Sequence, residues 1–197
     1  CAGVSTLEVR AGNQQLKAEN ATTFSAGVVI QPRKSLVFTV DYWSLRSNGV
    51  IGIQGAQNQI LFDLLERRNG RTNPNVVRLA PVGTQVVGDL SFVQDNFFNL
   101  GPRILRGLDF ELGYNLRRTP IGSFNVNLSA SKLIKFDQSP SDLQAQLIAA
   151  NAAGRLGPGI TITQAGSQVK INGNPEWRLS ADLNWKSGGA SAGVLVN

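Results

Sequence analysis

The segment RILRGLDFELGYNLRR at residues 103–118 decides the fold class. One face of this segment is apolar apart from Arg106: Ile104, Leu108, Phe110, Leu112, Tyr114 and Leu116. The opposite face, apart from Leu105, is polar or small: Arg103, Gly107, Asp109, Glu111, Gly113, Asn115 and Arg117. Alternation with a period of two predicts a β-strand with one apolar and one polar face.

Five further segments repeat this pattern: 24–31, 36–43, 123–131, 176–185 and 190–197. Their connections alternate in length, with short ones at 32–35, 118–121 and 186–188 and long ones at about 46–102 and 134–175. In an up-and-down antiparallel sheet, this alternation places every tight turn at one end and every long loop at the other. That asymmetry is typical of outer-membrane β-barrels. We therefore predict an all-β, antiparallel, up-and-down transmembrane barrel segment.

The long loops contain local structure of their own. AQNQILFDLLERR at 56–68 has its apolar side chains on one side and predicts a short helix. Ser139-Pro140-Ser141-Asp142 predicts a second helix with Ser139 as N-cap, ending at Gly154. A small hairpin is expected within 76–93, around Val82-Gly83. Counting that hairpin, the predicted strands rise from six to eight.

Composition excludes several classes of chemistry. The 197 residues include no His, no Met and one Cys, with a formal net charge of +6. Without His there is neither a Ser-His nor a Cys-His nucleophile pair, and no imidazole metal ligand. The basic residues are dispersed as singles or pairs, which argues against a nucleic-acid partner. We expect no enzymatic activity, catalytic residue, metal site or cofactor.

Alternation alone does not decide which face meets water. In a soluble β-sandwich the apolar faces would pack together, whereas in a membrane barrel they would face lipid. The predicted strands reach about 10 residues, as a tilted membrane span requires. Trp177 and Trp185 share a face, roughly 26 Å apart at about 3.3 Å per residue. Aromatic residues at both margins of an apolar band favour the barrel, and the sandwich stays as the alternative.

Four segments, in order, resemble TonB-dependent receptors of Gram-negative outer membranes. GNQQLKAE at 12–19 resembles a family motif that leads into a barrel strand, and FTVDYW at 38–43 resembles the strand after it. FNLG at 98–101, followed by RGLDFEL at 106–112, resembles a third segment. NPEWR at 174–178 resembles a fourth. Gln14 and Ala18 depart from the family pattern, which has Pro at both positions.

The resemblance implies a receptor with an N-terminal plug domain, a TonB-contacting segment and about 22 strands. Far fewer strands are predicted here, Met is lacking, and Asn197 is not aromatic. We therefore expect 1–197 to be an internal part of such a barrel, without the plug and the remaining strands. On this interpretation Cys1 is a loop cysteine whose disulfide partner lies upstream. The alternative is that Cys1 is the lipidated first residue of a lipoprotein.

The resemblance also implies a function in the outer membrane. A receptor of this kind binds a scarce ligand (a siderophore, vitamin or oligosaccharide) in its loops and imports it when TonB pulls on the plug. The expected partners are outer-membrane lipid, the plug, TonB and the small-molecule or oligosaccharide ligand. The rival hypothesis is a soluble or lipid-anchored β-sandwich that binds carbohydrate or protein.

Seven charged residues are candidates for lumen-facing contacts with a plug or ligand: Asp41, Arg103, Asp109, Glu111, Glu176, Arg178 and Asp182. The alternative is that they form solvated, mutually paired charges on the wet face, since surface ion pairs are common and contribute little.

Overall fold

The computed structural model describes residues 7–197, which form two compact units. The described part of the loop unit comprises residues 7–20, Ser47–Arg103 and Gln138–Gly166, and the sheet unit comprises Ala21–Arg46, Ile104–Asp137 and Ser167–Asn197. Cys1 lies outside the described residues, so its interpretations as a loop cysteine and as a lipidated residue both stay predictions. No helix within the described part is long and apolar enough to cross a membrane.

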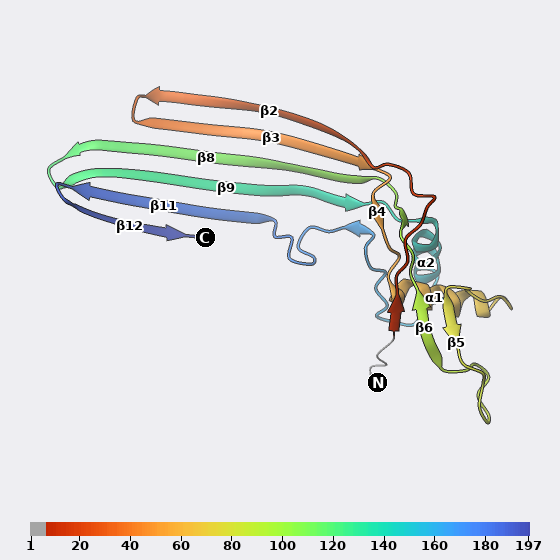
Figure 1. The fold of residues 1–197 in the computed structure, drawn as a ribbon. Coiled ribbons are helices and arrows are strands. Elements are labelled where there is room, and N and C mark those ends of the chain that lie inside the picture. The colour runs from red at the N-terminus through yellow and green to blue at the C-terminus, as the bar shows by residue number, and fades with distance from the viewer. Residues whose placement is uncertain (1–6) are drawn as a thin grey trace. The chain divides into compact units, whose positions relative to one another are not determined.

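The sheet unit is built from long strands in the order β12-β11-β9-β8-β3-β2 (Figure 1). Their bounds are β2 Asn20–Arg33, β3 Leu36–Asn48, β8 Arg103–Thr119, β9 Gly122–Gln138, β11 Trp177–Ser187 and β12 Ala190–Val196. A seventh strand, β10 (Gly166–Ser167), pairs with β9 beside this path. All six predicted strands are confirmed, and β8 and β9 reach 17 residues each.

Three tight turns join sequential neighbours in this sheet: β2 to β3, β8 to β9 and β11 to β12. Each leaves two residues between strands, at 34–35, 120–121 and 188–189. The long connections join β3 to β8 and β9 to β11, which are also neighbours. The predicted order of short and long connections is therefore confirmed. Its consequence is that the three tight turns share one end of the sheet (Figure 1).

The apolar face of the sheet unit is exposed. Leu179 is 66% exposed, Val28 60% and Phe24 59%. All buried hydrophobic side chains among residues 7–197 belong instead to the loop unit. A soluble sandwich would cover this face with a second sheet. Within the sheet unit no second sheet covers it, as expected for a face that meets lipid.

The loop unit folds around two helices, α1 (Ala56–Arg67) and α2 (Asp142–Ala152). Leucines from both helices form its apolar core, with Ala150 and Leu156: Leu61, Leu65 and Leu147. Beside the helices lies a three-stranded sheet in the order β1-β6-β5 (Figure 1), with bounds β1 Leu7–Val9, β5 Val76–Arg78 and β6 Leu90–Gln94. The predicted hairpin within 76–93 is confirmed as β5 and β6.

Two short pairings in the loop unit were not predicted. β1 pairs in parallel with β6, and β4 (Ile51–Gly52) pairs with β7 (Phe98–Asn99). The first pairing joins three residue pairs and the second joins two, which is too short for a period-two pattern to be recognised. The first pairing ties residues 7–9 to residues 92–94.

The predicted start of α2 was wrong by two residues. Ser141, rather than Ser139, is the N-cap: its side chain accepts a hydrogen bond from Gln144 N (3.2 Å). The Gln144 side chain in turn accepts from Ser141 N (2.9 Å), which completes a capping box. The capping box therefore joins Ser141 and Gln144, and not Ser139 and Asp142 as predicted. The predicted end is confirmed, because Gly154 follows the helix with φ +68°.

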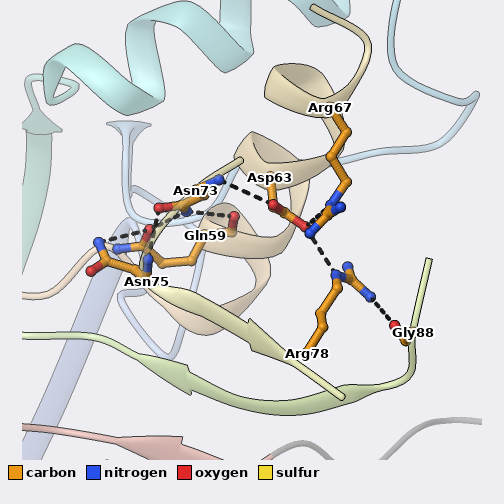
Figure 2. A network of polar contacts seen from close by, with 7 residues as sticks. All are labelled: Gln59, Asp63, Arg67, Asn73, Asn75, Arg78 and Gly88. Carbon is orange, nitrogen blue, oxygen red and sulfur yellow. Dashed lines mark hydrogen bonds and ion pairs between the residues drawn. The ribbon is translucent and has the colours of Figure 1, made fainter. Parts of the chain in front are cut away.

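Buried polar side chains hold α1 to β5 in the loop unit (Figure 2). The fully buried Asp63 carboxylate accepts from Arg67 Nε (2.8 Å), Arg78 Nε (3.1 Å) and Asn73 N (3.1 Å). Burial raises the pKa of Asp63, but these hydrogen bonds and the Arg67 charge outweigh it, so the pKa lies below its ordinary value. Asp63 therefore stays ionised inside the unit.

A second carboxylate caps α1 from outside the helix. The N-cap residue, Gly55, has no side chain with which to accept a hydrogen bond. Asp95 supplies the acceptor: its carboxylate takes hydrogen bonds from Gly55 N (2.6 Å), Gln54 N (3.2 Å) and the Gln59 side chain (3.3 Å). A negative charge at a helix N-terminus is stabilising. The long loop is therefore held by contacts between its own distant parts.

Candidate functional site

The polar face of the sheet unit is the candidate site, and strand register creates it. β9 and β11 pair antiparallel so that Asn127 lies opposite Asp182 and Asn125 opposite Asn184. On the other face of the same pair, Val126 lies opposite Leu183. A one-residue slip would mix the two faces. The register therefore keeps one continuous polar surface across the strands.

An amide–carboxylate ladder crosses this polar surface. Asn125 Nδ2 donates to Asn115 Oδ1 (2.6 Å), and Asn127 Nδ2 donates to Asn125 Oδ1 (2.7 Å). Asp182 Oδ2 accepts from both Asn127 Nδ2 (3.1 Å) and Asn184 Nδ2 (2.8 Å). The ladder connects β8, β9 and β11. It fixes the orientation of these side chains and leaves the Asp182 charge surrounded by amide donors.

Two glycines make room for large side chains on this face. A methyl group on Gly27 would collide with the Asp41 carboxylate, which lies over the neighbouring strand. A methyl group on Gly107 would likewise collide with the Trp43 ring. Both larger side chains therefore lie flat against the sheet. A glycine within a strand often marks such a close approach.

Four of the predicted site residues line two hollows beside β9. Asp109 and Arg178 line a hollow of about 330 Å³ together with Trp43 and Asn174. Glu111 lines a second hollow, of about 350 Å³, which also includes Asp182. The first hollow combines an aromatic ring, a carboxylate and a guanidinium. It can stack against a ring and form hydrogen bonds as both donor and acceptor.

The remaining predicted residues lie elsewhere. Glu176 forms an ion pair with Lys170 (2.6 Å), in which Lys170 is 71% exposed. Arg103 belongs to the loop unit and donates to Gln138 Oε1 (2.9 Å). Asp41 stays on the polar face, over Gly27. The structure thus brings Asp109 together with Arg178 and Glu111 together with Asp182, and it groups neither Arg103 nor Glu176 with them.

The sequence predictions missed the uncharged members of the site. Asn115, Asn125, Asn127 and Asn184 alternate with apolar residues in the predicted strands, but the seven candidates are all charged residues. Their regular spacing on that face, as Asn-x-Asn at 125–127, was the available signal. Trp43 was also missed, although it alternates with the apolar side chains of its strand.

The opposite, apolar face has an aromatic residue near each end of β11. Trp177 stacks on Phe110 (6.4 Å between ring centroids), and Lys132 Nζ lies 5.1 Å from the Trp177 ring centroid. Trp185 Nε1 donates to the Ile121 carbonyl in a tight turn (2.8 Å). Amphipathic side chains of this kind collect where an apolar band meets water.

No group of three His, Cys, Asp or Glu side chains within residues 7–197 is arranged to hold a metal ion. Comparison with protein families gave a match over residues 3–195 to the family described as "TonB dependent receptor-like, beta-barrel". Searches among curated proteins and among solved structures gave no match.

Proposed function

The chain belongs to the TonB-dependent receptor-like β-barrel family, whose members are outer-membrane receptors and transporters, and we propose that its polar face lines the aqueous interior through which a scarce ligand passes. The observation that carries this proposal is the exposed apolar face of the sheet unit, opposite a polar face joined by the asparagine ladder. In a membrane barrel the apolar face contacts lipid and the polar face contacts water.

The hollow formed by Trp43, Asp109 and Arg178 is the proposed ligand contact on this face. An aromatic ring beside charged hydrogen-bonding groups suits a polar organic ligand that carries rings and hydroxyl groups. An oligosaccharide, a siderophore or a vitamin has this chemistry. Glu111 and Asp182 provide a second set of contacts, for ligand or for the plug of the receptor.

We also propose that the sheet is one sector of a larger barrel. β2 and β12 are the two edge strands of the described sheet, and they do not pair with each other. In a bilayer an open edge leaves backbone N–H and C=O groups unsatisfied. Further strands must therefore pair with both edges. The plug and TonB act on that complete receptor.

The three tryptophans of the chain test the orientation of the faces. In the intact receptor, reconstituted in liposomes, single-tryptophan variants retain Trp43, Trp177 or Trp185 and replace the other tryptophans by Phe. Brominated phospholipids quench a tryptophan that contacts acyl chains. We expect strong quenching of Trp177 and Trp185 and little quenching of Trp43, which lies on the polar face over Gly107.

Trp43 is the matched control, because it belongs to the same sheet and differs in the face it occupies. Equal quenching of all three tryptophans, or quenching of Trp43 alone, contradicts the proposed orientation. A receptor that remains monomeric without detergent, with none of the three quenched, supports the soluble alternative instead.

A further inference from the structure

The tight turns of the sheet unit and the strand ends beside them carry positive charge without negative charge. Five basic residues lie there: Arg33, Lys34, Arg117, Arg118 and Lys186. The sequence has no Asp or Glu between Glu19 and Asp41, between Glu111 and Asp137, or after Asp182. The tight-turn end of all three hairpins is therefore cationic, although the chain contains 13 acidic residues in total.

The described residues place no carboxylate beside these cations. Among residues 7–197, none of the five has a carboxylate within ion-pair distance. Near the long-loop end of the strands, by contrast, Lys135 pairs with Asp137 (2.9 Å) and Lys170 with Glu176 (2.6 Å). The positive charge at the tight turns is thus left uncompensated by the described chain.

Two of the five cations converge on one hollow. Arg117 and Lys186 line a space of about 440 Å³ on the polar face. Lys186 pairs in register with Ser123 on β9 and with Ser191 on β12. The polar side chains that complete the hollow come from four strands: Asn115, Ser123, Asn125, Asn184 and Ser191.

The hydrogen-bond ladder leaves mainly donors facing this hollow. Asn115 Oδ1 is occupied by Asn125 Nδ2, so the Asn115 amide keeps its N–H groups for another acceptor. Asp182, the nearest acid along β11, accepts from Asn127 and Asn184 and lines the neighbouring hollow instead. The space beside Arg117 and Lys186 contains no carboxylate.

We propose that this hollow is a binding site for a small anion carrying a carboxylate or phosphate group. The Arg117 guanidinium matches the two oxygens of such a group, and the Lys186 ammonium adds a second charge. Asn115 and the Ser191 hydroxyl supply neutral donors. The inference rests on the proposed function in one respect, that the polar face is in water. It adds an anion site at the tight-turn end, away from the hollow formed by Trp43.

Charge-selective thiol labelling tests the site. In the intact receptor carrying Cys1→Ser, Ser191→Cys places a thiol in the hollow. Its reaction rates with an anionic and a cationic methanethiosulfonate are each divided by the rate for free cysteine. We expect the anionic reagent to be favoured roughly tenfold, since clustered charge in a cleft concentrates counter-ions. Millimolar citrate or inorganic phosphate should slow the anionic reaction.

Variants of the two cations give the decisive comparison. Arg117→Gln with Lys186→Gln should remove the preference and the protection by citrate and phosphate, whereas Arg117→Lys with Lys186→Arg should retain the preference. Ser129→Cys is the matched control, because it lies on the same polar face beside Glu111 and Asp182. It should show no preference for the anionic reagent.

The outcomes separate this inference from the proposed function. Equal preference at Ser191→Cys and Ser129→Cys, or no effect of citrate and phosphate, overturns the anion site alone. Slow reaction of Ser191→Cys with both reagents, while Ser129→Cys reacts, means that another part of the receptor fills the hollow, and it overturns the small-anion assignment. Failure of both thiols to react with either reagent overturns the aqueous face and the anion site together.

Discussion

At the scale of single residues, Asp63 shows how a charge is kept inside the loop unit. Its side chain has no exposed surface, yet two arginines and a backbone N–H hold it ionised. Such a buried pair is costly to break, because removal of one partner leaves an uncompensated charge. The ion pair of Glu66 with Arg71 contributes less, because the Arg71 side chain is 65% exposed and water screens its charge.

The lowered pKa of Asp63 predicts acid sensitivity of the loop unit. Because the folded pKa lies below the unfolded value of about 3.9, the stabilisation is present above that value and is lost as the pH falls through the folded pKa. In the intact receptor, we expect amide hydrogen exchange in α1 to accelerate relative to unstructured peptide as the pH falls below about 4.

Two variants serve as controls for this acid response. Asp63→Asn should weaken protection at neutral pH and flatten the response, because the titrating group is gone. Glu66 also has a lowered pKa, because of its hydrogen bond from Arg71. Glu66→Gln should nevertheless leave the response almost as in the natural chain, because Arg71, its ion-pair partner, is 65% exposed and water screens the pair. An unchanged acid response in Asp63→Asn would contradict this assignment.

At the scale of elements, α2 shows how local sequence can suggest two starts for one helix. Ser139 and Ser141 are both suitable N-caps by type, and Pro140 suits the first helical position after Ser139. The structure selects Ser141 because Gln144 reciprocates its hydrogen bond. Ser141 Oγ also donates to the Gln54 side chain in the other long loop (2.8 Å). That contact lies 87 residues away in sequence, outside any local pattern.

Ser141→Ala should destabilise α2 by about 1 kcal/mol, the usual contribution of an N-cap side chain. Ser139→Ala is the matched control and should have a smaller effect, because Ser139 does not cap the helix. Hydrogen exchange or limited proteolysis across 142–152 in the intact receptor measures both. A larger effect from Ser139→Ala would mean that Ser139 is the N-cap, as the sequence predicts, and would contradict the assignment to Ser141.

At the scale of the whole molecule, the two units are stabilised differently. The loop unit has an apolar core and a buried polar network, and every buried side-chain nitrogen or oxygen among residues 7–197 has a hydrogen-bond partner. The sheet unit exposes its apolar face and ends at two open strand edges. Lipid and further strands are what such a sheet requires.

Residues 1–197 expressed by themselves should therefore fail to stay monomeric in detergent-free buffer. Exposed apolar surface and unpaired edges promote association. We expect large aggregates by size-exclusion chromatography with light scattering, and dispersal on addition of detergent. A soluble monomer with a cooperative thermal transition would contradict the membrane assignment and support the soluble alternative.

The sequence alone determined the six long strands, their two faces, the alternation of short and long connections and the positions of α1 and α2. These features are local, because period-two alternation and helix signals depend on neighbouring residues. It also indicated the family through four short segments. The charged candidates on the polar face followed from the same alternation.

Only the tertiary structure decided which side chains meet. It paired β1 with β6, placed Arg78 and Asn73 around Asp63, and brought Arg117 and Lys186 to one hollow. It also showed that Arg103 donates to Gln138 within the loop unit. Alternation assigns a residue to a face but carries no information on strand register or on contacts between distant loops. Those contacts depend on chain closure and packing, which no local pattern encodes.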